Sequence, residues 1–238
     1  YEINFNQFLG YAETLMNKQS FDYVLLSIPP LTVLKCGSFL ARKYKIPMVL
    51  DVRDFENDIL LYRQKKQSWF RRLQHKLLML HFKKWVNHDI IICTVSPPLT
   101  DYISLSTGKN ALTLTNGFNE ELLIVDEPQS KDWFTITVTG TLYEFANIGV
   151  MLETCKMVIS RHSEVKIKFQ FIGLMANENV ARMFNEIIPP QNLVLTHRVP
   201  QPEAMQLASA SHVLMLAGFD EMKGVYTTKI FEYLGLRR

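Results

Sequence analysis

The sequence predicts an α/β protein built from two parallel β-sheets whose faces are covered by helices. Short apolar runs without polar alternation, such as 21–28, are typical of strands that are buried on both faces of a sheet. Each run is followed by a segment with helical spacing of its apolar residues, such as 31–44. This alternation predicts two doubly wound domains.

In the first half of the chain, Pro29 and Pro30 end the first apolar run and separate it from the helical segment that follows. The same alternation of an apolar run and a helical segment recurs along this half. The predicted strands are 21–28, 46–52, 88–96 and 110–117, and the predicted helices are 31–44, 68–86 and 97–104.

A polar stretch at 126–132, DEPQSKD, interrupts this rhythm and carries a proline. We therefore expect a linker at 126–133 between a domain at 1–125 and a domain at 134–238. After the linker the alternation restarts. The predicted strands are 134–140, 166–173, 193–196 and 212–216, and the predicted helices are 147–160, 178–187, 202–209 and a terminal helix that begins near residue 228.

The amino-acid composition agrees with an α/β enzyme, and the net charge does not indicate a nucleic-acid partner. The chain is 47% hydrophobic and 21% charged, and its formal net charge of +3 is too small to indicate a nucleic-acid partner. Cys36, Cys93 and Cys155 lie far apart, which predicts neither a disulfide framework nor a metal site, so a reducing cytoplasmic compartment is expected. No run has the length of a transmembrane helix.

The C-terminal segment AGFDEMKGVYTTKIFEYLGLRR combines residues that suit a nucleotide diphosphate. Gly224 allows a close approach, the hydroxyls of Thr227 and Thr228 predict an N-cap, and Lys229 lies in the first helical turn, where free N–H groups favour an anion. Glu232 follows one turn later, where its carboxylate could accept hydrogen bonds from a ribose. An ordinary capped amphipathic helix is the alternative.

This segment, together with five earlier blocks, resembles the family 4 glycosyltransferases, which are retaining enzymes with the GT-B fold. The blocks are DVRD at 51–54, TVSPPLTDYI at 94–103, LTNGFNEE at 114–121, FTITVTGTLYEFANI at 134–148 and FIG at 171–173. The resemblance implies two Rossmann-like domains that face a cleft, both of them incomplete in this chain. It also implies a nucleotide-sugar substrate, which we expect to be UDP-linked, and a glycan or lipid-linked acceptor. The residues themselves require no metal, since Lys229 and helix N-termini can carry the charge of the diphosphate, and we expect no cofactor.

Ligands of parallel sheets bind outside the carboxyl ends of the strands. Gly140 and Thr141 follow the first strand of the second half, and the resemblance favours binding of the donor diphosphate there, although a simple strand-to-helix turn glycine is the alternative. A first-turn lysine paired with a strand that ends in glycine predicts that Lys229, across the cleft from Gly140, binds the same diphosphate. Gly173 has a structural role by expectation. Arg198 and Val199 follow 193–196, where the family presents backbone groups to the nucleobase, and a surface arginine is the alternative.

In the first half, Asp51, Arg53 and Asp54 end a predicted strand. A carboxylate beside an arginine could orient an acceptor hydroxyl, and Asp54 and Glu232 are the expected catalytic residues. A structural ion pair is the alternative reading of this cluster.

The chain departs from the family at one position. Many relatives carry a second glutamate eight residues before the one that corresponds to Glu232, and Gly224 stands there. The chain also resembles a fragment that lacks both ends of the family pattern. A non-catalytic module that binds a nucleotide sugar or a partner is therefore the second functional class.

The stretch 59–88 carries eight basic residues and no acidic one, with aromatic and leucine residues between them. Its 63–84 part reads as a basic amphipathic helix, a composition that suits the anionic inner surface of a membrane. The alternative is a helix that covers a sheet and has a solvated basic face. No nucleic-acid-binding motif accompanies the charge.

Overall fold

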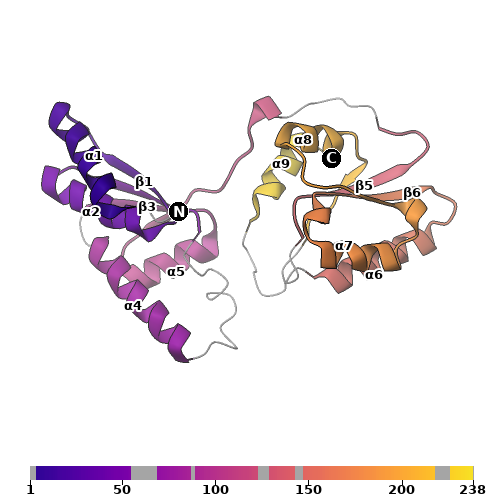
Figure 1. Ribbon diagram of the computed structural model, residues 1–238, viewed down its shortest axis with the longest axis horizontal. Coiled ribbons are helices and arrows are strands. Elements are labelled where there is room, and N and C mark those ends of the chain that lie inside the picture. The colour runs from indigo at the N-terminus through magenta and orange to yellow at the C-terminus, as the bar shows by residue number, and fades with distance from the viewer. Residues whose placement is uncertain are drawn as a thin grey trace. The chain divides into compact units, whose positions relative to one another are not determined.

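The computed structural model describes residues 4–54, 69–86, 89–122, 129–142, 147–217 and 226–237. The chain forms two compact units. The first contains 1–115 with 221–226, and the second contains 116–220 with 227–238 (Figure 1). The predicted linker at 126–133 stays a prediction, because part of it lies outside the described residues.

The sheet of the first unit has four parallel strands in the order β1-β2-β3-β4. Among the described residues, three helices connect successive strands. Because the strands step in one direction, right-handed crossovers place these helices on the same face of the sheet. The strands are β1 (Val24–Ile28), β2 (Met48–Val52), β3 (Ile90–Thr94) and β4 (Ala111–Thr113), and the connecting helices are α2 (Leu31–Tyr44), α4 (Trp69–Trp85) and α5 (Pro97–Thr107).

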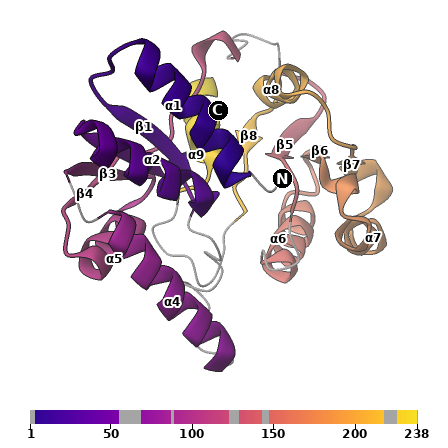
Figure 2. The ribbon, with the colours of Figure 1, turned by 60° about the vertical axis from the view of Figure 1, so that its left-hand side comes forward.

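Helix α1 (Phe5–Lys18) has no counterpart among the predicted elements. None of its residues is buried, although Phe5, Phe8, Ala12 and Leu15 recur at helical spacing. The Asn4 side chain caps it by accepting hydrogen bonds from two backbone N–H groups of the first turn. It packs against α2 (Figure 2), and an ion pair between Glu13 and Lys43 joins the two helices.

The core of the first unit lies between the sheet and these helices. Leu34 of α2 and Phe82 of α4 are fully buried and belong to one cluster with Leu50 and Ile92 of the strands. On the opposite face of the sheet, the side chains of Leu25, Ile91 and Leu112 are exposed.

The sheet of the second unit has four parallel strands in the order β7-β6-β5-β8. The chain adds β6 and β7 on one side of β5 and then returns to add β8 on the other. The strand order therefore reverses at β5, which makes its carboxyl end a topological switch point. The strands are β5 (Phe134–Thr139), β6 (Ile167–Ile172), β7 (Leu193–Leu195) and β8 (Val213–Leu214).

Helices cover both faces of this second sheet, as predicted (Figure 1). Phe184 of α7 and Cys155 of α6 are buried in a cluster on one face, and Ala208 of α8 lies in the cluster on the other face with Leu236 of α9. The helices are α6 (Ile148–Arg161), α7 (Glu178–Ile187), α8 (Gln201–Ser209) and α9 (Thr228–Leu236), and short 3-10 turns lie at Glu120–Leu122, Leu174–Ala176 and Pro190–Asn192. The predicted α/β class with two parallel sheets is confirmed.

Candidate functional site

Two glycines form a floor without side chains at the carboxyl edge of the second sheet. Gly140 follows β5 and Gly173 follows β6, and both have positive φ, +97° and +94°. The backbone N–H of Gly140 donates to the carbonyl of Ile172 at 2.8 Å, and a Cβ added at Gly173 would lie 3.6 Å from the carbonyl carbon of Gly140. Because this φ range is open to glycine at little cost, both positions allow a ligand to approach the backbone closely.

Lys229 lies beside this floor. A Cβ added at Gly140 would lie 3.4 Å from its Cε atom. Both residues belong to the second unit. Helix α9 returns to the sheet that carries Gly140 and so brings Lys229 next to it, whereas the binding of a diphosphate by these two residues stays a prediction.

Glu232 holds two protein partners at once. Its Oε2 atom lies 2.7 Å from Nζ of Lys229, and its Oε1 atom accepts a 2.9 Å hydrogen bond from the side-chain amide of Gln201. The Glu232 side chain is 12% exposed and that of Lys229 is 30% exposed. The carboxylate is therefore fixed in orientation and compensated in charge, at the start of α8 and the first turns of α9.

Tyr233 fixes the position of α9 against the sheet. Its hydroxyl oxygen accepts a 2.8 Å hydrogen bond from the backbone N–H of Thr139, and it lies 3.1 Å from the Thr139 hydroxyl. The side chain is buried, and this burial raises the pKa of the Tyr233 phenol. Since Thr139 immediately precedes Gly140, this contact sets how far Lys229 and Glu232 lie from the glycine floor.

Arg198 reaches the same place from the loop after β7. Its Nη2 and Nε atoms lie 2.9 Å and 3.3 Å from Oγ1 of Thr141, and its Cγ lies 3.7 Å from a Cβ added at Gly173. In the part of the chain that the structure describes, Arg198 forms no ion pair. Lys229 shares its charge with Glu232, so Arg198 is the cation here whose charge is not compensated by an acid.

The remaining predicted residues of this half take different places. Val199 packs against the core cluster of Ile172 and Leu236, so its side chain is structural. Thr228 begins α9 and Thr227 is its N-cap, but the Thr227 hydroxyl makes no capping hydrogen bond, contrary to the prediction. Gly224 lies outside the described residues.

In the first unit, the predicted strand-end cluster contains an ion pair. The Nε atom of Arg53 lies 2.6 Å from Oδ2 of Asp51, which also lies 3.4 Å from the hydroxyl of Ser27 at the end of β1. The other oxygen, Oδ1 of Asp51, is buried without a hydrogen-bond partner. Asp54 is exposed two residues beyond β2. The structure thus brings Asp51, Arg53 and Ser27 together and leaves Asp54 at the surface.

The described residues contain no cluster of three or more side chains that could hold a metal ion. The thiols of Cys36 and Cys155 are buried, which raises the pKa of both, that of Cys155 to about 12. No helix within the described ranges is both long and apolar enough to cross a membrane.

Sequence reasoning left Arg198 with two interpretations, treated Gly173 as structural and assigned Tyr233 no role in the site. Arg198 meets Thr141 across 57 residues, and Tyr233 meets Thr139 across 94. The available signal was the position of Arg198 and Gly173 directly after strands, since the carboxyl ends of parallel strands meet at one edge.

No protein-family model matches the sequence, and no curated protein matches it. The structure, however, is similar to solved structures. HepE from Anabaena, in complex with UDP, has a TM-score of 0.66 and 10% identity over 97% of this chain and 61% of its own. Sucrose-phosphate synthase from Thermosynechococcus elongatus has a TM-score of 0.59 and 10% identity, with 88% and 53% of the two chains covered.

The catalytic domain of starch synthase IV from Arabidopsis thaliana, bound to ADP and acarbose, has a TM-score of 0.57 and 13% identity over 98% of this chain and 60% of its own. The chain thus spans between half and two thirds of the length of these structures. At such low identity the likeness shows the fold, which is the GT-B arrangement of two Rossmann-like units.

Proposed function

We propose that the protein is a glycosyltransferase that takes a sugar from a nucleotide diphosphate, and that its second unit binds this nucleotide sugar. One observation carries the proposal. Gly140, Gly173, Arg198 and the Lys229–Glu232 pair lie together at the switch point of the second sheet, where ligands of such sheets bind. The shared fold of HepE with UDP and of starch synthase IV with ADP supports a nucleotide diphosphate as the ligand.

The diphosphate lies over the two glycines in this proposal. Its oxygens can approach the glycine backbone closely there, because no side chain intervenes. The N–H groups of Gly140 and Gly173 already donate to Ile172 and Thr196, so the neighbouring cations compensate the charge of the diphosphate. The guanidinium of Arg198 offers two parallel N–H donors, a geometry that matches phosphate oxygens. Lys229 and the first turn of α9, whose Thr227 hydroxyl makes no capping hydrogen bond, add further positive potential.

The ribose binds to Glu232. A carboxylate offers about four lone-pair sites, of which Lys229 and Gln201 use one on each oxygen. The two ribose hydroxyls can therefore donate to Glu232 without displacing either partner. Because both protein partners hold the carboxylate in place, little ordering is required when the nucleotide binds.

The transfer follows the retaining course that the family 4 resemblance implies. The bond between the anomeric carbon and the diphosphate oxygen breaks, and the acceptor oxygen bonds to the same face of that carbon. The acceptor proton passes to the leaving diphosphate oxygen. The protein then contributes positioning and charge stabilisation, and no metal or cofactor is part of the proposal. Asp54 would orient the acceptor hydroxyl.

The finer parts of the proposal are a UDP-linked hexose as the substrate, a lipid-linked or polysaccharide acceptor and a place at the cytoplasmic face of the membrane. The competing function is a non-catalytic module that binds the nucleotide sugar at the same residues. Binding alone does not separate the two functions, whereas transfer does.

The test uses the full-length protein in two steps. Calorimetry with UDP, GDP, ADP and uridine measures which base binds and how much the diphosphate contributes. Release of free nucleotide from the matching nucleotide sugar, with and without lipid-linked and glycan acceptors, measures transfer. Binding with acceptor-dependent release supports the glycosyltransferase, binding without release supports the module, and the absence of binding overturns both.

Lys229→Ala sharpens the first step. We expect it to raise the Kd of the nucleoside diphosphate far more than that of the nucleoside, because only the diphosphate reaches the first turn of α9. Equal losses for both ligands would rule out the assignment of Lys229.

A further inference from the structure

The helix α4 of the first unit has two apolar faces. One face enters the core through Met79 and Phe82. The other points to solvent, and its side chains remain exposed: Trp69 is 75%, Leu73 44%, Leu77 49% and Leu80 55% exposed, and Phe70 is exposed as well. Since successive helical residues are about 100° apart, these five side chains fall within about 100° of the circumference and form one continuous stripe along the helix.

Basic residues border this stripe. With the same angle of about 100° between successive residues, Arg72, Lys76 and Lys83 lie together on one side of the stripe, and Lys84 lies within it. All four are exposed. The sequence of α4 contains no aspartate or glutamate. Long basic side chains beside an apolar stripe can keep their ammonium groups in water while their stems cover apolar surface.

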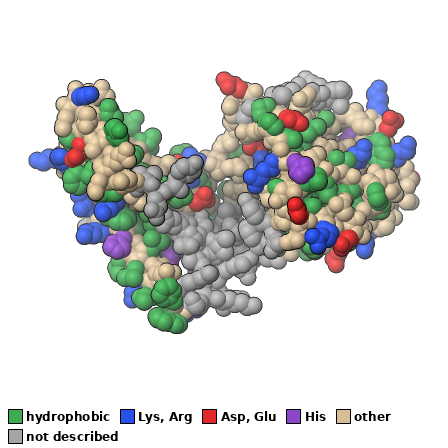
Figure 3. All heavy atoms as spheres, in the orientation of Figure 1, with side chains coloured by type: hydrophobic (Ala, Val, Ile, Leu, Met, Phe, Trp, Pro, Cys, Tyr) green, Lys and Arg blue, Asp and Glu red, His purple; other side chains and the backbone are tan. Residues whose placement is uncertain are grey.

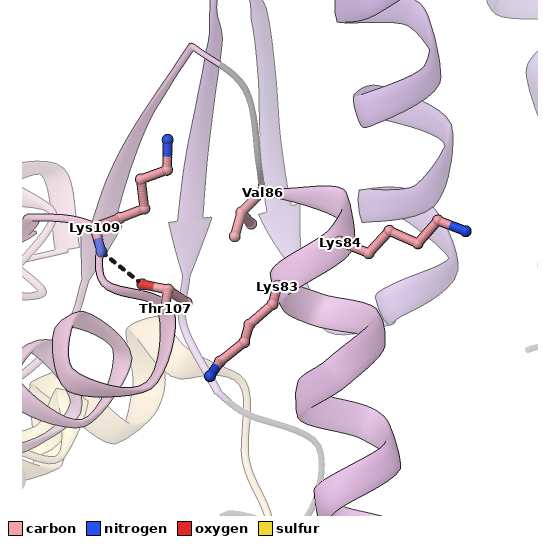
Figure 4. Close-up of a pocket in the computed structure, with 5 residues that line it drawn as sticks. All are labelled: Lys83, Lys84, Val86, Thr107 and Lys109. Atoms are coloured by element: carbon pink, nitrogen blue, oxygen red, sulfur yellow. Dashed lines mark hydrogen bonds between the residues drawn. The ribbon is translucent and has the colours of Figure 1, made fainter.

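A cavity of about 240 Å³ continues the basic border at the end of α4. Lys83, Lys84, Val86, Thr107 and Lys109 line it, and the backbone N–H of Lys109 donates to the Thr107 hydroxyl at 3.2 Å. The side chain of Lys83 extends toward the end of α5, whereas that of Lys84 points away on the far side of α4 (Figure 4). Because α4 and α5 both end here, the negative ends of their helix dipoles offset part of the positive charge of these lysines. The cavity therefore extends the basic border of the apolar stripe and is not an anion site by itself.

The charges decide which partner fits. Two copies of this chain facing each other through α4 would place lysines against lysines, because α4 offers no acid. The exposed face of the first sheet provides the contrast. Leu25, Ile91 and Leu112 are apolar and exposed there, but the four strands contain no lysine or arginine. Of these two surfaces, the α4 stripe and the exposed face of the first sheet, only the α4 stripe combines exposed apolar side chains with a basic border.

We propose that α4 is a docking helix for an anionic membrane surface. It lies parallel to the membrane, with the side chains of Trp69, Leu73, Leu77 and Leu80 at the boundary between headgroups and acyl chains and with its basic residues at the phosphate level. Hydrophobic side chains gather at the end of α4 that lies lowest in Figure 3, in keeping with such a contact. The proposal is carried by α4 alone and does not depend on the nucleotide site.

The experiment measures sedimentation of the full-length protein with two kinds of vesicle, an equimolar mixture of phosphatidylglycerol and phosphatidylcholine and pure phosphatidylcholine. We expect binding to the anionic vesicles only, and release by salt, because screening reduces the attraction of the surface for the basic residues. The variant Arg72→Gln/Lys76→Gln/Lys83→Gln/Lys84→Gln should lose affinity by about two to three orders of magnitude, as expected for four surface charges.

The apolar stripe has its own variant, Leu73→Gln/Leu77→Gln/Leu80→Gln, which keeps every charge. We expect it to bind the anionic vesicles at least tenfold more weakly. The matched control is Tyr11→Gln/Leu15→Gln/Leu105→Gln, which removes exposed apolar side chains from α1 and α5 and should bind like the wild type. All the replaced side chains are exposed, so circular dichroism and Tm should show the wild-type fold.

Trp69 fluorescence adds a readout that does not need sedimentation. Vesicle binding should shift its emission to the blue, and Trp69→Phe should abolish the shift, although Trp85 and Trp133 remain. The proposal is overturned if the wild type ignores anionic vesicles at low salt, if the apolar variant binds as tightly as the wild type, or if the stripe instead supports a dimer that this variant dissolves. Each of these outcomes leaves the nucleotide-binding result unaffected.

Discussion

The Nζ atom of Lys229 lies 2.7 Å from Oε2 of Glu232, three residues further along α9. The pair has no net charge, although it stands beside the glycine floor of Gly140 and Gly173. A nucleoside diphosphate brings a charge of about −2 to −3, so the site needs another cation. Within the described residues, Arg198 is placed to supply it through its contact with Thr141.

Replacing Arg198 by glutamine should weaken binding of the nucleoside diphosphate and leave the nucleoside unaffected. A hydrogen bond to a charged group contributes about 1.5–3 kcal/mol, which corresponds to about 10- to 150-fold in Kd. Calorimetry with UDP and uridine checks this, provided that uracil is the preferred base. Arg198→Lys should recover part of the loss, and Arg182→Gln on the exposed side of α7 is the matched control. An equal loss for UDP and uridine would contradict the assignment.

Replacing Glu232 by glutamine should weaken nucleotide binding by about 1–3 kcal/mol, because the ribose loses a charged acceptor. The nucleoside should lose as much as the diphosphate, in contrast to the Arg198 variant. Gln201→Ala should cause a smaller loss, since it removes only the group that holds Oε1. Unchanged nucleotide affinity in Glu232→Gln would remove Glu232 from the site.

Replacing Gly140 by alanine should destabilise the second unit and weaken nucleotide binding. The new Cβ must adopt a φ of +97° and lies 3.4 Å from Cε of Lys229. Backbone strain of this kind costs about 1–3 kcal/mol. Gly149→Ala is the matched control, because this helical position has open space around it and gains up to about 1 kcal/mol. Urea unfolding of both variants measures the difference, and equal midpoints would contradict the expectation.

Replacing Tyr233 by phenylalanine should cost about 1–3 kcal/mol of stability, because it leaves the backbone N–H of Thr139 buried without its partner. The same change should loosen α9 and lower nucleotide affinity, although Tyr233 itself touches no ligand in the proposed site. A variant with wild-type stability and affinity would show that α9 is held by its apolar contacts alone.

The stability of the protein should fall at alkaline pH. Burial raises the pKa of the Cys155 thiol to about 12. The folded pKa lies above the unfolded value of about 8.5, so this contribution is complete below that value and is lost as the pH rises through the folded pKa. Urea unfolding between pH 8 and 12 should show this decline, and Cys155→Ala should show a shallower one. An identical pH dependence in the variant would rule out Cys155 as the cause.

Much of the fold was predictable, because the local spacing of apolar residues indicates most of its helices and strands. The helices at 31–44 and 178–187 have the predicted bounds, since each has a strongly amphipathic pattern and a clear end. The short strand β8 was predicted as 212–216 and is shorter, because pairing with β5 covers only Val213 and Leu214. Helix α1 has no buried residue, but its Phe5, Phe8, Ala12 and Leu15 recur at helical spacing, so this helix was predictable from the sequence although it was not predicted.

The candidate site divides in the same way. The positions of Gly140 and Thr141 after a strand, of Lys229 in a first helical turn and of Glu232 one turn later are local features, and the sequence by itself determined them. Only the tertiary structure decided that Lys229 lies next to Gly140, that Arg198 reaches Thr141 and that Tyr233 holds α9 to Thr139. These contacts join residues tens of positions apart. They depend on strand order and crossover direction, which place the carboxyl ends of parallel strands side by side. Neither property produces a periodic pattern of residues in the sequence.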